Sequence, residues 1–203
     1  MKFTLYYHGL LPSAANSARL PEKHAIRKAV HLQLVELMNR DQNLPKVPGG
    51  QWHNWEKWKW PVIGNPAWGE DNTVVLLGTK HFVPLVRKGL HLHCELDVLF
   101  LRHGEPGSII NSGDIDNRLL TLSDGLRLPK NEQEIAYMEG QNDFPQNEPV
   151  FCLLEDDALI SRWNVKTDRL LDQVEHDLSV RLIIEVRLKA TKVVFQNLEL
   201  LGD

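Results

Sequence analysis

Carboxylates gather in two short segments of this sequence, and their spacing fits a divalent-metal site. The first segment holds Asp114 and Asp116 two residues apart, and Asp124 follows eight residues after Asp116. The second segment, the EDD of residues 155–157, directly follows the apolar run PVFCLL. Neighbouring carboxylates repel one another unless a cation joins them, and such oxygen ligands suit magnesium or manganese. If folding brings the segments together, they form a phosphoryl-transfer site, where a metal ion ionises water and neutralises charge on a phosphodiester.

A helix that begins at Asp116 or Asn117 would position the first group of acids, because both residue types are good N-caps. At about 100° per residue, its apolar stripe consists of Leu119, Leu122 and Leu126. A different face of this helix carries Asp116, Leu120, Asp124 and Arg127. The partial positive charge of the helix N-terminus favours ionised acids there. A capped helix with a solvated acidic turn explains the same residues without a metal, so spacing alone leaves both interpretations open.

The elements around these acids are strands and helices in no strict alternation, which favours an α+β fold. Apolar residues at helical spacing predict an amphipathic helix from Pro21 to about Arg40. Alternating or short apolar runs predict strands at residues 2–8, 90–100, 149–154, within 155–166 and at 179–190. Residues 166–178 fit helix or extended chain equally well. We expect one domain over residues 1–203, with insertions at 43–80, which holds five of the six tryptophans, and at 129–149, which is rich in loops.

The composition is that of an ordinary globular protein, with 42% hydrophobic and 25% charged residues. No run approaches the roughly 20 apolar residues that cross a bilayer, so we expect no membrane partner. MKFTLYYH alternates like a strand and is followed by Gly9, so we expect a cytoplasmic protein rather than a signal peptide. Cys94 and Cys152 belong to no CxxC pair, which predicts two buried thiols. The net charge of -4 means that a nucleic-acid partner needs local basic patches or bound metal ions.

The order of these motifs resembles the RusA-like family of Holliday junction resolvases. The resemblance rests on DIDN at 114–117, DGL at 124–126, and DDA at 156–158 with Lys166 after it. The opening YYHGLLPSAAN is also similar to the family's first strand and its Pro-Ser-x-Asn loop. The matching pieces cover about half of the chain in the family's order.

The resemblance implies a RusA-like mixed sheet with flanking helices and a homodimer that binds branched DNA. It also implies a hydrolase of DNA recombination and repair, namely an endonuclease that cuts with magnesium or manganese. Carried over by position, the implied metal ligands are Asp114, Asp116 and Asp157. The implied supporting residues are the acids Asp124 and Asp156 and the cation Lys166.

One position departs from the family pattern, which has a lysine four residues after the second aspartate of D-x-D-N. Here that residue is Leu120. The family's lysine stabilises the phosphate in the transition state, and loss of one such charge costs on the order of 10² to 10³ in rate. Local candidates for a replacement cation are Arg118, Arg127 and Lys166. The alternative function is a non-cleaving DNA-binding or interaction protein of the same fold.

Three further groups have both a chemical and a structural interpretation, and we favour the structural one in each case. Tryptophans interleaved with lysines could stack on unpaired bases or cover an apolar surface: Trp52, Trp55, Trp58 and Trp60. Alternate residues of the strand at 90–100 could bind a transition metal or form a solvated face: His91, His93, Glu95 and Asp97. The helix at 21–40 has a basic side that could contact DNA or is simply solvated: His24, Arg27, Lys28 and His31.

Overall fold

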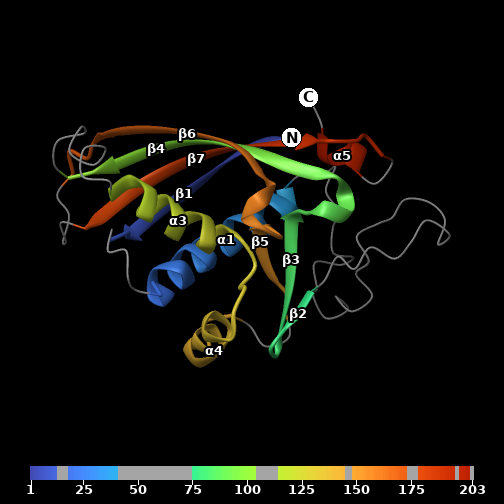
Figure 1. Ribbon diagram of the computed structural model, residues 1–203, viewed down its shortest axis with the longest axis horizontal. Coiled ribbons are helices and arrows are strands. Elements are labelled where there is room, and N and C mark those ends of the chain that lie inside the picture. Colours follow the sequence, from blue (N-terminus) through green and yellow to red (C-terminus); the bar gives the residue numbers. More distant parts are fainter. Residues whose placement is uncertain are drawn as a thin grey trace.

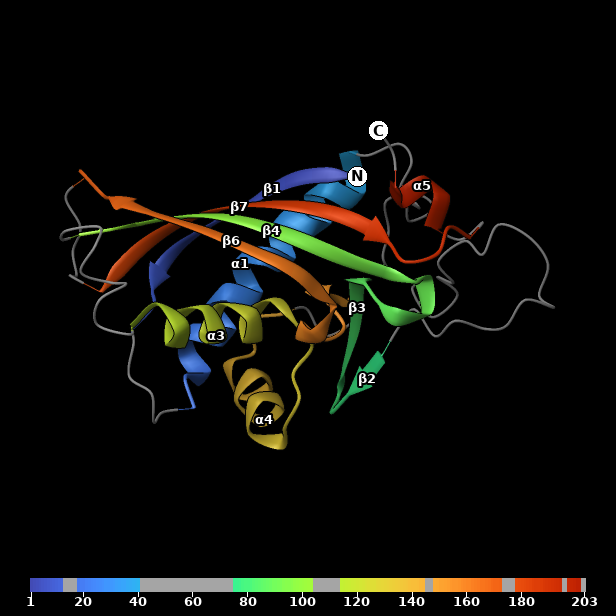
Figure 2. The ribbon, with the colours of Figure 1, turned by 45° about the horizontal axis from the view of Figure 1, so that its top comes forward.

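The computed structural model describes residues 1–12, 18–40, 75–103, 114–144, 148–172, 178–194 and 197–201. Two mixed sheets and three longer helices form an α+β fold in this part of the chain (Figures 1 and 2). The predicted α+β class is therefore confirmed. Most of the predicted insertion at 43–80 lies outside the described residues. This part includes the tryptophans that alternate with lysines, namely Trp52, Trp55, Trp58 and Trp60. A single domain over 1–203 stays a prediction.

The larger sheet has four strands in the order β1-β7-β4-β6. Their bounds are β1 (Lys2–Leu10), β7 (Ser179–Ala190), β4 (Leu92–Arg102) and β6 (Ile160–Arg169). β7 is antiparallel to both β1 and β4, whereas β4 and β6 run parallel. The strands predicted from alternation are confirmed here, and β6 also covers the undecided start of 166–178. Because parallel neighbours need a long crossover, the chain between β4 and β6 has to return along the sheet.

The smaller sheet has the order β2-β3-β5. Its strands are β2 (Val75–Leu77), β3 (Lys80–Val86) and β5 (Val150–Leu154). The apolar run at 149–154 predicts β5 correctly, whereas the β2–β3 hairpin was not predicted from the sequence. β3 is buried on both faces, so its residues form a continuous apolar run without the alternation that marks a half-buried strand.

The helices are α1 (Leu20–Arg40), α3 (Asp114–Leu126), α4 (Glu132–Gln141) and the short α5 (Leu198–Leu201). Figure 1 shows the larger sheet as one layer with α1 and α3 beneath it. The helix predicted at 21–40 is confirmed, and α3 begins two residues before Asp116. None of the described helices combines the length and the apolar character that a membrane span requires.

α4 corrects the expectation that residues 129–149 are rich in loops. Asn131 caps this helix, since its side chain accepts a hydrogen bond of 2.8 Å from the backbone N–H of Glu134. The buried residues of α4 are Glu134 and Met138. One apolar and one charged buried residue make too weak a pattern for periodicity to predict the helix.

The main hydrophobic core of the described residues lies between the larger sheet and the helices, and a second, smaller cluster contains Phe82, Met138 and Cys152. Alternate residues of β4 are buried, among them Leu96, Val98 and Phe100. Cys94 and Cys152 are buried and free, as expected from the sequence. Burial raises the pKa of each thiol to about 12, so both stay protonated and unreactive at neutral pH.

Gly125 lies at a close contact between α3 and α1. A Cβ atom at this position would lie 2.7 Å from both Cβ and Cγ2 of Ile26, which is fully buried. We expect Gly125→Ala to lower the free energy of unfolding by about 1 to 3 kcal/mol, although alanine gains about 1 kcal/mol in helix propensity. Urea denaturation measures this change.

Gly140 in α4 is the matched control, because a Cβ atom there meets nothing within 4 Å. We expect Gly140→Ala to raise the free energy of unfolding by up to about 1 kcal/mol. If both variants were stabilised alike, the close approach of α1 and α3 would not constrain position 125.

Candidate active site

The C-terminal end of α3 lies beside the second acidic segment. Arg127, the residue after α3, forms an isolated parallel bridge with Leu154 at the end of β5. The backbone N–H of Leu128 donates to the carbonyl of Leu154 at 3.0 Å. After Leu154, the chain continues into the short 3-10 turn η5 (Asp157–Leu159). The acids around residue 156 are thereby fixed next to the last turn of α3.

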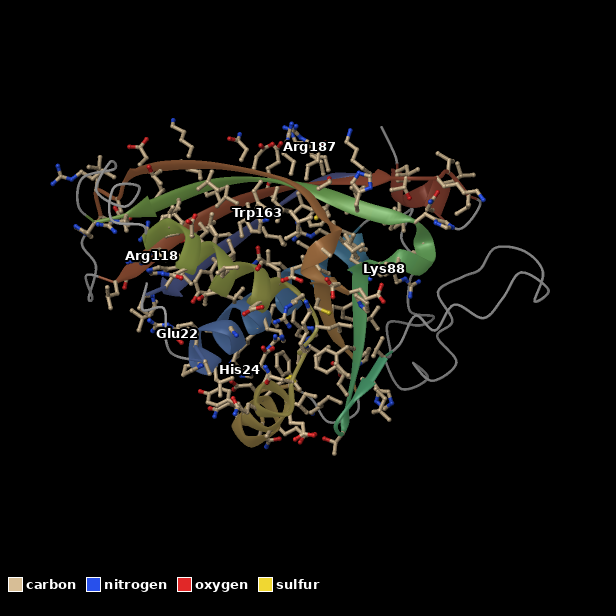
Figure 3. All side chains as sticks on the ribbon, viewed as in Figure 1. Glu22, His24, Lys88, Arg118, Trp163 and Arg187 are labelled. Atoms are coloured by element: carbon tan, nitrogen blue, oxygen red, sulfur yellow. The ribbon has the colours of Figure 1, made fainter. Side chains whose placement is uncertain are left out.

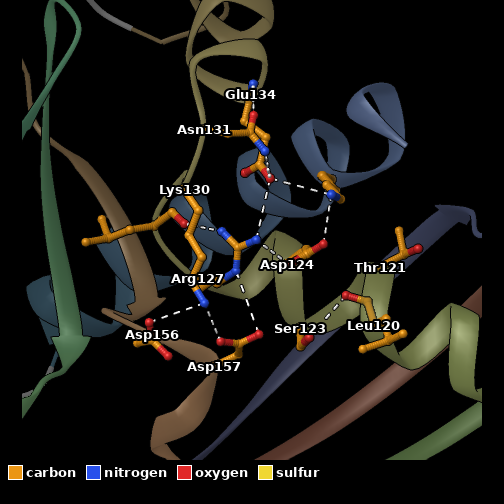
Figure 4. A network of polar contacts seen from close by, with 12 residues as sticks. Leu120, Thr121, Ser123, Asp124, Arg127, Lys130, Asn131, Glu134, Asp156 and Asp157 are labelled. Carbon is orange, nitrogen blue, oxygen red and sulfur yellow. Dashed lines mark hydrogen bonds and ion pairs between the residues drawn. The ribbon is translucent and has the colours of Figure 1, made fainter. Parts of the chain in front are cut away.

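Two cations lie between these acids (Figure 4). The Lys130 ammonium donates to Asp157 Oδ1 at 2.6 Å and is 3.2 Å from Asp156 Oδ2. Arg127 pairs with Asp124 and is 3.9 Å from Asp157 Oδ2. The hydrogen bond to Asp157 raises the pKa of Lys130. A hydrogen bond from the backbone N–H of Ala158, and to a lesser extent Lys130, lowers the pKa of Asp156.

A buried carboxylate extends this network toward α1. Glu134 is only 3% exposed, and it lies 3.3 Å from Arg27 Nη2 and 3.5 Å from both Arg127 Nη2 and Lys23 Nζ. Lys23 also pairs with Asp124 Oδ2 at 2.7 Å. Burial lowers the pKa of Arg27, and Glu134 partly offsets this effect. Three cations of α1 and the α3 end therefore surround Glu134.

The basic side of α1 is a packing surface, which corrects the expectation that it is solvated. His24, Arg27 and His31 are all buried, and only Lys28 remains exposed. Asp143, just after α4, is 3.0 Å from both His24 Nε2 and Lys28 Nζ. His24, Arg27 and His31 are therefore buried through polar contacts with α4, β5 and the residue after α4, although their polar character predicts exposure to solvent.

His31 gives the fold a pH dependence. Burial lowers the pKa of its imidazole to about 4, and its Nδ1 accepts a hydrogen bond of 3.0 Å from the backbone N–H of Phe151. The unfolded chain binds a proton near pH 6.5, whereas the folded chain does so only near pH 4. The neutral imidazole therefore contributes stability above about pH 6.5, and this is lost as the pH falls toward 4.

We expect His31→Asn to flatten this part of the stability curve, because the asparagine oxygen can accept the Phe151 N–H without titrating. Between pH 8 and pH 4, the wild type should lose on the order of 2 to 3 kcal/mol of its free energy of unfolding through His31, and the variant should not. Urea unfolding between pH 4 and 8 measures it. His8→Asn, on the exposed side of β1, is the control that should keep the slope. An unchanged slope in His31→Asn would contradict the assignment.

The predicted ligands on α3 lie at its other end. Asp116 is exposed on the first turn of the helix, about 12 Å along the axis from Asp124 at 1.5 Å per residue. The side chain of Asp114 lies outside the described residues. Leu120 is 61% exposed between the two aspartates. The described structure thus brings together Asp124, Asp156 and Asp157 and leaves Asp116 two turns away.

The three candidate cations lie in different places. Lys166 is exposed on β6, 4.0 Å from Asp168, while Trp163 and Val165 of the same strand pack against the core. Lys166 therefore lies on the face of the sheet opposite α3. In Figure 3, Arg187 marks this opposite face of the sheet and Arg118 marks the side of α3. Arg118 is buried and donates a hydrogen bond to the carbonyl of Leu11.

In the described part of the chain, Arg127 pairs with Asp124 and Asp157, and Lys130 also pairs with Asp157. Lys130 was not predicted from the sequence. Its only signal is its position three residues after Arg127 in the RLPK segment, where the chain leaves α3.

The donor pair of Asp156 and Asp157 fits a hard divalent cation, since both carboxylates already approach one ammonium group. A third ligand from Asp116 would have to span two helical turns. Among the described residues, no group of three or more His, Cys, Asp or Glu could hold a metal ion. The predicted set of Asp114, Asp116 and Asp157 stays a prediction.

The polar face of β4 is satisfied by arginines. Arg162 Nη2 lies 3.2 Å from Glu95 and 3.4 Å from Asp97, and Arg187 Nη2 lies 3.1 Å from Asp97. A hydrogen bond from Asn164 is the main cause that lowers the pKa of Asp97. His91 has φ 54° in the turn before β4, so the expectation that it shares the strand face is wrong.

Comparison of the chain with protein-family models, with curated proteins and with solved structures found no match in any of the three. The class of the protein is therefore defined by its own fold and site. It is an α+β protein in which an ion-pair network joins acids from two distant segments.

Proposed function

We propose that this chain is a metal-dependent endonuclease that cuts branched DNA as a homodimer, in line with its resemblance to RusA-like resolvases. The observation that supports this proposal most is the network at the end of α3. There, Asp124 lies in one network with Asp156 and Asp157, which come from a segment about thirty residues further along the chain. A helix cap alone does not account for this convergence.

The chemistry of the proposal needs acids that stay ionised and cations that meet phosphate. The lowered pKa of Asp156 keeps it available as a ligand beside Asp157. A bound magnesium or manganese ion would supply an ionised water and neutralise phosphoryl charge. Arg127 and Lys130 place fixed positive charge next to the acids, where negative charge develops on the phosphodiester oxygens.

A second candidate function is a non-cleaving protein that binds branched DNA on the same fold. Two observations favour it. Leu120 exposes an apolar side chain where the family has a lysine, and Lys130 already neutralises Asp156 and Asp157.

Cleavage of a labelled four-way junction, with linear duplex as the control substrate, tests both candidates with and without Mg²⁺ or Mn²⁺. We expect metal-dependent cutting of the junction, lost in Asp157→Asn and kept in Asp168→Asn. Asp168 is the matched control because it is an exposed acid on the opposite face of the sheet. Thermal unfolding checks that each variant is folded.

The outcomes separate the candidates. Tight binding of the junction without cutting would establish the non-cleaving function. Cutting lost in Asp116→Asn but kept in Asp157→Asn would move the site to the start of α3. Neither binding nor cutting in the wild type would reject both candidates.

A further inference from the structure

A cavity of about 400 Å³ opens beside the turn between β3 and β4. One wall comes from the short 3-10 turn η4 (Lys88–Leu90) and the residues that follow it, and the opposite wall from η5. Figure 3 labels Lys88 at this turn. Cavities of this volume hold small organic ligands.

The greater part of the cavity surface is apolar. Leu92 from β4 and Ala158 and Leu159 from η5 supply this part. Leu92 belongs to the main core and is 2% exposed, so its position is fixed by packing. A rigid apolar wall of this kind favours a flat ring over a fully hydrated ion.

The polar part of the cavity is basic. Lys88, His91 and His93 line it. The described residues provide no ion pair for the Lys88 ammonium, and the buried Nδ1 of His93 has no hydrogen-bond partner among them. Buried polar atoms are nearly always paired, so the unpaired Nδ1 of His93 is an exception beside this cavity.

The neighbouring acids are already engaged. Glu155 Oε2 accepts from the backbone N–H of Lys88 at 2.8 Å, and Glu95 pairs with Arg162. The hydroxyls of Ser161 and Thr191 donate to the carbonyls of Cys94 and His91. The polar groups that remain available at the cavity are therefore the nitrogen-bearing side chains of Lys88, His91 and His93.

We propose that this cavity binds an aromatic phosphate of about mononucleotide size, with its ring on the Ala158 and Leu159 wall and its phosphate against Lys88, His91 and His93. A phosphate can accept a charge-assisted hydrogen bond from the Lys88 ammonium together with hydrogen bonds from imidazole N–H groups, and Lys88, His91 and His93 all line the cavity. The cavity shares η5 with the acidic network, but none of the acids of that network lines it. The proposal stands whether or not the chain cuts DNA.

Isothermal titration calorimetry of the full chain tests this site with adenosine 5′-monophosphate and phenyl phosphate. Adenosine and inorganic phosphate are the probes that lack one half of the ligand. We expect at least one aromatic phosphate to bind with a Kd below about 1 mM. We expect adenosine and inorganic phosphate each to bind at least about 10-fold more weakly.

Two variants locate the binding. Lys88→Ala removes a cation from an exposed position, and Ala158→Trp fills the cavity; each should weaken binding by about 10-fold or more. Lys28→Ala removes an exposed lysine of α1 that does not line the cavity, and it should bind like the wild type.

Three results would overturn the proposal. The first is absence of binding by both aromatic phosphates. The second is inorganic phosphate that binds as tightly as they do, which means an adventitious ion only. The third is binding that neither Lys88→Ala nor Ala158→Trp weakens, because the ligand then lies elsewhere.

Discussion

Replacing Glu134 with glutamine is expected to lower the free energy of unfolding by about 3 to 5 kcal/mol. Glu134 is the buried carboxylate that Arg27, Arg127 and Lys23 share. Arg27 and Arg127 are themselves 2% and 5% exposed. Glutamine keeps the size of the side chain but removes the charge. Arg27 then loses its carboxylate partner beside the positive charge of Arg127, whereas Arg127 keeps its pair with Asp124.

Urea denaturation at pH 7 measures this effect. Glu132→Gln is the matched control, because Glu132 lies on the same helix and is exposed. It should change the free energy of unfolding by less than about 0.5 kcal/mol. The double variant Arg27→Met with Glu134→Gln should recover part of the loss, because it also removes one uncompensated charge. Equal stability of Glu134→Gln and Glu132→Gln would show that the network contributes nothing to the fold.

The second large effect is expected from Leu120→Lys, on the proposed nuclease activity. The variant restores the cation of the family pattern between Asp116 and Asp124. We expect the single-turnover rate of junction cleavage in Mg²⁺ or Mn²⁺ to rise by about 10² to 10³. Because Leu120 is 61% exposed, the fold accepts the change. Ion pairs with the acids four residues away on either side add about 0.2 to 0.5 kcal/mol each.

Leu171→Lys is the matched control for this gain, since Leu171 is 87% exposed and lies outside α3. It adds the same charge and so reproduces any general strengthening of DNA binding. If both variants cut faster by the same factor, the increase would come from the added net charge and not from the position of the lysine in α3. A stabilised Leu120→Lys protein that still does not cut would favour the non-cleaving function.

The strands and the long helix could be predicted because their buried residues are apolar. Leu92 to Phe100 alternate along β4, and Ile26, Val30 and Leu34 form the stripe of α1. The packing of α4 could not be predicted in this way. Its main buried anchor is Glu134, and the residues that receive it on α1 are also charged. Sequence periodicity assigns such residues to solvent, and only the tertiary ion pairs bury them.

The acidic site could be predicted in its composition but not in its geometry. β6 runs parallel to β4 with Ile160 opposite Cys94, near the start of β4. α3 begins after the far end of β4 and runs back along the sheet (Figure 2). The end of α3, with Asp124, therefore meets η5, whereas Asp116 lies away from it. Residue spacing carries no information about this direction.

The order of strands in the larger sheet also sets the order in which the protein can fold. β7 lies between β1 and β4, and Lys2 is opposite Arg187 in the register. Among the described strands, β1 pairs within this sheet with β7 alone, so this pairing forms only after β7 has been synthesised. Contacts so distant in sequence slow folding, and an apolar strand that waits for its partner is exposed to association with other chains. Assembly of the larger sheet thus depends on β7, which takes a central position between β1 and β4 rather than an edge.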